Sequence, residues 1–121
     1  VPIAAASDNI QDPFHPFGRG DLLQIGLVTA YAAHLAKEED IPTLLRMLTS
    51  LPAQITGTRP YGIEPNHPAG FVVLDAKSGE ELFQEIPATR WVYNRSRWIH
   101  ASRLNRQWAQ AWQPLGMESI G

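Results

Sequence analysis

The sequence contains no cysteine among its 121 residues. Disulfide bonds and thiolate metal sites are therefore excluded, and any metal ion bound by this chain needs His, Asp or Glu ligands. No apolar run approaches the roughly 20 residues of a membrane-spanning helix, so we expect no membrane partner. Residues 1–6 are apolar but lack the basic start of a signal peptide. We therefore expect a soluble, cytoplasmic protein.

Charge is also scarce. Charged residues make up 18% of the chain and the net charge is −2, so we expect no nucleic-acid partner. Arginines beside tryptophans in residues 90–108 leave stacking on single-stranded nucleic acid open, but the acidic balance favours a solvated hairpin with buried tryptophans. Hydrophobic residues make up 44%, as in a globular domain. A complete (β/α)8 barrel of about 250 residues is nevertheless excluded by length.

The first third of the chain has an α/β pattern. Apolar residues 1–7 stop at Asp8, and a run this short suits a buried, parallel-type strand better than a helix. Such a strand must pair with neighbours, which indicates a truncated protein. Residues 8–20 form a loop rich in Pro, Gly and aromatic side chains. Asp21 then has the character of an N-cap for an apolar helix that extends to about Lys37.

Further along, the period of the apolar residues changes from helical to strand-like. Apolar side chains at helical spacing predict a helix that begins near residue 41, and Gly57 closes a short helix over residues 51–57. We then expect strands at 71–74, 90–93 and 98–101, a short helix at 79–86, and a hairpin with a four-residue loop at 94–97. Leu104, Trp108 and Trp112 would share one face of a helical tail.

The strongest chemical feature is the acidic residue at the end of the predicted first strand. In α/β barrels, groups at the carboxyl ends of strands line the active site. Asp8 in that position could bind a metal ion or accept a proton from metal-bound water. Asp and Asn are also common in turns, so the pattern alone leaves a loop-capping role for Asp8 open.

Two segments carry a resemblance to a known family. Residues 7–24, SDNIQDPFHPFGRGDLLQ, resemble the final-strand segment of the cytosine deaminase branch of the amidohydrolase superfamily. Residues 61–65, YGIEP, with 69–76, AGFVVLDA, are similar to the closing stretch in which amidohydrolases return to a small β-sandwich. The resemblance covers about residues 1–102, and its first segment is the more specific.

The resemblance implies an α/β fold that is the C-terminal part of an amidohydrolase (β/α)8 barrel. Residues 1–57 would be the last strand and terminal helices of the barrel. Residues 58–102 would be part of the small β-sandwich subdomain, and residues 103–121 a tail. The complete enzyme would hydrolyse C–N bonds of a nitrogen heterocycle or cyclic amide.

The resemblance also implies roles for single residues. Asp8 matches the metal-binding, catalytic aspartate, with zinc or iron as the metal in the complete enzyme. Asn9 and Phe14 match substrate-binding positions, while Asp12 and Gln11 would shape the loop. Cytosine deaminase has aspartate where this chain has Asn9, which argues against cytosine itself as the substrate.

The chain departs from the family pattern in its histidines. It has no His-x-His pair, and none of its four histidines falls at a ligand position. One carboxylate cannot hold a catalytic metal that needs three protein ligands. We therefore expect the N-terminal part of the same enzyme as a partner, homo-oligomers, and no activity from the isolated chain. The alternatives are a non-catalytic dimerisation module, using helix 22–36 and the tryptophan tail, and an amidohydrolase acting on acyl-amino acids.

Overall fold

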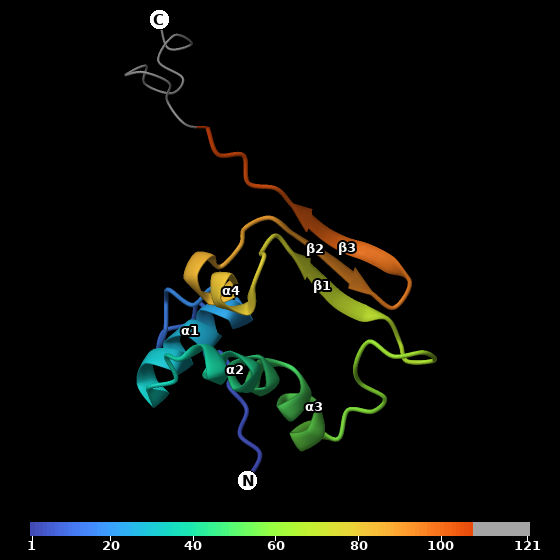
Figure 1. Ribbon diagram of the computed structural model, residues 1–121, viewed down its shortest axis with the longest axis horizontal. Coiled ribbons are helices and arrows are strands. Elements are labelled where there is room, and N and C mark those ends of the chain that lie inside the picture. The colour runs from blue at the N-terminus through green and yellow to red at the C-terminus, as the bar shows by residue number, and fades with distance from the viewer. Residues whose placement is uncertain (108–121) are drawn as a thin grey trace, which may run out of the picture.

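The computed structural model describes residues 1–107, in which a group of short helices carries a three-stranded sheet at one side (Figure 1). The elements in chain order are α1 (Leu22–Ala33), η1 (Glu38–Asp40), α2 (Ile41–Leu48), α3 (Ser50–Thr56), β1 (Gly70–Leu74), α4 (Gly79–Glu85), β2 (Arg90–Asn94) and β3 (Arg97–Ser102). No helix within these residues is long and apolar enough to cross a membrane. Leu104 of the predicted tail helix lies in a segment without regular structure, and Trp108 and Trp112 lie outside the described residues.

Helix α1 begins and ends with recognisable caps. The Asp21 carboxylate accepts a hydrogen bond from Leu23 N at 3.0 Å, which confirms Asp21 as the N-cap. The helix ends at Ala33 rather than near Lys37, because His34 adopts a left-handed conformation with φ 55°. Leu35 N then donates to Ala30 O at 2.9 Å and the Leu35 side chain packs against the core.

The next two helices agree with the helical pattern of the sequence. α2 has Pro42 in its first turn, where the missing N–H of proline costs no hydrogen bond. α3 is followed by its C-cap Gly57, whose φ of 72° is readily available to glycine. Thr58 N donates back to Ala53 O at 2.9 Å and closes this helix end.

The sheet is antiparallel with strand order β1-β2-β3. Its hairpin turn is shorter than predicted: Asn94 pairs with Arg97, so the loop is Arg95 and Ser96 alone. Arg95 takes a left-handed φ of 56°, which permits this tight connection. A β-bulge interrupts the register of β2 and β3 near Tyr93.

One small core joins the helices to the sheet. Leu23 of α1, Leu44 and Leu48 of α2, and Phe83 of α4 are buried together, and Leu74 at the end of β1 packs against them. Since α4 connects β1 to β2, burial of Phe83 fixes that end of the sheet against the helices.

The predicted strand over residues 1–7 is not formed within the part of the chain that the structure describes. The segment has no regular secondary structure, and Ala5 N donates a backbone hydrogen bond to Met47 O at 3.0 Å. All strands within residues 1–107 belong to the one antiparallel sheet, so the segment has no parallel neighbour there. The α/β class is confirmed.

Candidate functional site

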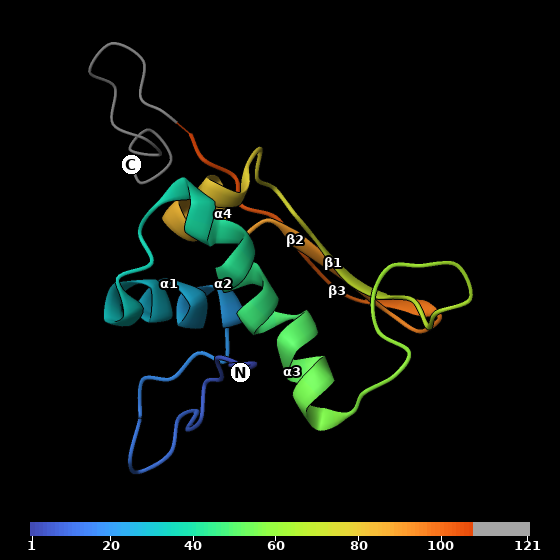
Figure 2. The same ribbon diagram turned by 60° about the horizontal axis from the view of Figure 1, so that its bottom comes forward.

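The three candidate site residues lie on the loop of residues 8–20, which projects from the N-terminal end of α1 (Figure 2). Asp8 is exposed and has a left-handed φ of 54°, while Asn9 is half-buried. The Phe14 side chain is 88% exposed. The three residues therefore share one loop, and Asp8 and Phe14 are exposed on it.

Asp12 holds the middle of the loop in shape. Its Oδ1 accepts hydrogen bonds from Phe14 N at 2.9 Å and from His15 N at 2.8 Å. One carboxylate that receives two successive backbone N–H groups fixes a turn of the Asx type. The prediction that Asp12 shapes the loop is confirmed, and this turn sets the backbone position of Phe14.

Gly18 closes the loop against its own beginning. It is buried, and a Cβ atom at this position would lie 2.8 Å from Asn9 O and 2.9 Å from Ile10 Cα. Both are backbone atoms that cannot move aside independently, so the contact requires glycine. The sequence interpretation did not single out Gly18. The signal was present in Pro16-Phe17-Gly18, where a glycine follows a proline and an aromatic residue in a loop.

A second missed feature ties the far end of the loop to the sheet. Arg90 Nη1 lies 3.1 Å from Asp21 Oδ2, and these side chains are 21% and 15% exposed. Arg90 Nε also donates to Pro87 O at 2.9 Å. No local sequence signal pairs these residues, because α1 and β2 are far apart along the chain.

The described residues do not form a metal site by themselves. Within residues 1–107, no group of three or more His, Asp or Glu side chains is close enough to hold a metal ion. The histidines are dispersed: His15 is in the loop, His34 ends α1, His67 precedes the sheet and His100 is in β3. Asp8 as a metal ligand stays a prediction.

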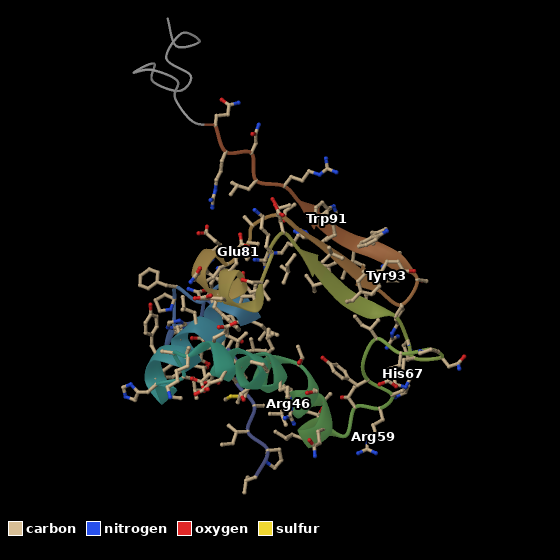
Figure 3. All side chains as sticks on the ribbon, in the orientation of Figure 1. Arg46, Arg59, His67, Glu81, Trp91 and Tyr93 are labelled. Atoms are coloured by element: carbon tan, nitrogen blue, oxygen red, sulfur yellow. The ribbon has the colours of Figure 1, made fainter. Side chains whose placement is uncertain are left out.

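Two hollows occur away from the loop. A groove of about 700 Å³ runs between residues 1–6 and helices α1 and α2, lined by side chains that include Ile3, Leu35 and Met47. A second hollow of about 560 Å³ lies between α3 and residues 58–67. In it, His67 Nδ1 is buried without a hydrogen-bond partner. Figure 3 shows the Arg59 side chain pointing outward, so its guanidinium does not face His67.

Comparison by sequence finds enzymes that are several times longer than this chain. It is 37% identical over 79 residues to N-isopropylammelide isopropyl amidohydrolase from Pseudomonas sp. (strain ADP), a match that covers 64% of this chain and 20% of the relative. It is 31% identical over 103 residues to pterin deaminase from Rhizobium rhizogenes (strain K84), covering 84% and 23% respectively. The chain thus spans about a fifth of the length of these relatives. No protein-family model matches the chain.

Comparison of structures gives the same picture for the fold. The chain superposes with a TM-score of 0.78 on 5-methylcytosine deaminase from Klebsiella pneumoniae, at 23% identity, covering 90% of this chain and 27% of that one. N-isopropylammelide isopropylaminohydrolase from Burkholderia multivorans gives a TM-score of 0.79 at 22% identity, covering 84% and 26%. The relatives are amidohydrolases and deaminases, and the chain matches a fragment of them. The predicted resemblance is confirmed.

Proposed function

We propose that this chain is the C-terminal part of a metal-dependent hydrolase that acts on C–N bonds of a nitrogen heterocycle or cyclic amide. The observation that carries the proposal is the 37% identity to N-isopropylammelide isopropyl amidohydrolase. The match to pterin deaminase supports it, since both names describe hydrolytic chemistry on nitrogen-containing rings.

Three residues have distinct roles in this proposal. Asp8 is the carboxylate that the chain contributes to metal binding and to proton transfer. Asn9, next to it, offers an amide that can donate and accept hydrogen bonds to a heterocycle. Phe14, which is 88% exposed, offers an aromatic face against which a planar ring can stack. The constrained turn at Asp12 and the closure at Gly18 support these positions.

The domain division follows from the same proposal. Residues 1–57 would complete a (β/α)8 barrel, residues 58–102 would belong to a small β-sandwich, and residues 103–121 would be a tail. The apolar groove along residues 1–6 supports the first part, because it leaves apolar side chains such as Ile3, 61% exposed, without cover. We infer that the preceding part of the same enzyme covers it, with residues 1–7 becoming the last barrel strand.

The metal, zinc or iron, would be bound by the complete enzyme rather than by this chain. Such an ion would supply Lewis-acid chemistry at the scissile C–N bond. The described residues provide one candidate ligand, so the remaining ligands must come from the preceding part of the enzyme. We therefore expect the isolated chain to be inactive.

The test compares two aspartates in the full-length protein. Asp8→Asn should lose bound metal and lower activity about 100-fold on a panel of N-isopropylammelide, pterin and 5-methylcytosine, because it removes a proposed metal ligand. Asp75→Asn is the matched control, since Asp75 is exposed near the end of β1. Full metal content and activity in Asp8→Asn, or no activity of the unsubstituted protein on the panel, would overturn the proposal.

A non-catalytic dimerisation module is the second candidate. Apolar side chains on α1 favour it, because Val28 and Tyr31 are 57% and 74% exposed. Light scattering of the full-length protein separates the two functions. A dimer that Tyr31→Ala dissociates, with neither metal nor hydrolytic activity, would favour the module over the hydrolase.

A further inference from the structure

The Asp21 carboxylate has two partners at once. Its Oδ1 accepts the hydrogen bond from Leu23 N at 3.0 Å that caps α1, while its Oδ2 lies 3.1 Å from Arg90 Nη1. Asp21 is also the residue at which the loop of residues 8–20 ends. The same side chain therefore joins the end of the candidate loop, the start of α1 and the first residue of β2.

Arg90 is held in place for this contact. Its Nε and Nη2 both donate to Pro87 O, which leaves Nη1 directed at Asp21. The Arg90 and Asp21 side chains are 21% and 15% exposed, so water and salt screen their attraction less than that of a surface pair. The pair between Arg106 and Glu85 is a useful contrast, because its atoms are 3.4 Å apart and its side chains 59% and 50% exposed.

The other end of the loop is anchored separately. Ala5 N donates to Met47 O in α2, and Gly18 packs on the backbone of Asn9. The chain just before the loop is thus held on α2, and the loop ends at Asp21. That end is fixed by a side chain from the sheet.

We propose that Arg90 is a positioning residue for the loop of residues 8–20. Through its contact with Asp21, Arg90 fixes the loop to the sheet and so determines where Asn9 and Phe14 lie. The role of those residues in binding substrate rests on the proposed function. The mechanical coupling of sheet and loop does not, because it follows from the contacts of Arg90 and Asp21 alone.

Trypsin measures this coupling directly. Arg19 is the sole Lys or Arg in residues 1–36, so cleavage after it reports opening of the loop. Asp21→Ser keeps an N-cap side chain but loses the charge, and Arg90→Gln removes the other partner. Each should accelerate cleavage after Arg19 by about fivefold, since cleavage follows the population of the open loop. The double variant should be no faster than either single variant.

Arg106→Gln is the matched control and should leave cleavage after Arg19 unchanged, because its ion pair is exposed. Three outcomes would overturn the coupling. In the first, Arg90→Gln has no effect on cleavage after Arg19. In the second, the effects of the single variants multiply in the double variant. In the third, all tryptic sites accelerate equally, which would indicate a general loss of stability instead.

Steady-state kinetics of the full-length enzyme then test the positioning role. Arg90→Gln should raise KM severalfold and change the ratio of kcat/KM between pterin, which has two fused rings, and 5-methylcytosine, which has one, at unchanged metal content. A purely structural role would reduce the active fraction and leave KM and the ratio unchanged, which would overturn the positioning role. An inactive unsubstituted enzyme would instead overturn the proposed function, while the trypsin experiment still decides the coupling.

Discussion

Gly26 of α1 lies directly against Phe83 of α4. A Cβ atom added at Gly26 would be 2.5 Å from Phe83 Cε1 and 2.8 Å from Leu48 Cδ1. The absence of a side chain at this one position lets three helices meet in the core. Because α4 lies between β1 and β2 in the chain, the same contact determines how closely the sheet approaches the helices.

We predict that Gly26→Ala destabilises the chain, although alanine is the better helix former. The intrinsic preference would favour Ala by about 0.5–1 kcal/mol. Overpacking of a core site costs about 1–3 kcal/mol and exceeds that gain. Urea denaturation should therefore show a net loss of about 1–2 kcal/mol in the free energy of unfolding.

Two further variants identify the cause. Combining Gly26→Ala with Phe83→Leu should recover part of the loss, because the shorter side chain vacates the overlapping position. Val28→Ala on the same helix should change stability by about 0.5 kcal/mol or less, since Val28 is 57% exposed. A larger free energy of unfolding in Gly26→Ala than in the unsubstituted chain would contradict the prediction, because it would show that the helices move apart at little cost.

Local signals account for the parts of the fold that were predicted correctly. Asp21 and Gly57 cap helices through contacts within their own neighbourhood, and the apolar side chains of α2 recur at helical spacing. Residues 1–7 do not form the predicted strand here for the opposite reason. Their apolar pattern is that of a strand, but a strand exists only with a partner, and residues 1–107 supply none beside it.

The candidate site shows the same division. The turn at Asp12 could be predicted, because it is made by a side chain and the N–H groups two and three residues later. The ion pair of Arg90 with Asp21 could not, since only the folded chain brings β2 to the start of α1. The contact of Gly18 with Asn9 is an intermediate case. The sequence indicates that a glycine occurs in the loop, but it does not indicate that this glycine packs against Asn9.

We predict that Asp12→Ala loosens the candidate loop without unfolding the rest of the chain. The variant removes the acceptor of two backbone hydrogen bonds, each worth about 1 kcal/mol at most in this exposed position. Hydrogen exchange at the amides of Phe14 and His15 should accelerate about fivefold. Thermal unfolding of the core should stay within about 2 °C of the unsubstituted chain.

Asp12→Asn is the matched variant, because asparagine retains the side-chain oxygen that accepts both hydrogen bonds. Its exchange rates should stay near those of the unsubstituted chain. If Asn accelerates exchange as much as Ala does, then the negative charge, rather than the acceptor geometry, holds the turn.

Phe14 and Phe17 offer a direct test of which aromatic side chain of the loop meets the substrate. They are 88% and 85% exposed, so neither contributes much to the core, and substitution should leave the free energy of unfolding unchanged. We predict that Phe14→Ala in the full-length enzyme raises KM for a heterocyclic substrate about tenfold, by removing a stacking contact of about 1.4 kcal/mol. Phe17→Ala should change KM less than about twofold. Equal effects of the two substitutions would mean that the loop contributes a general apolar surface, and a larger effect at Phe17 would move the ring-binding role from residue 14 to residue 17.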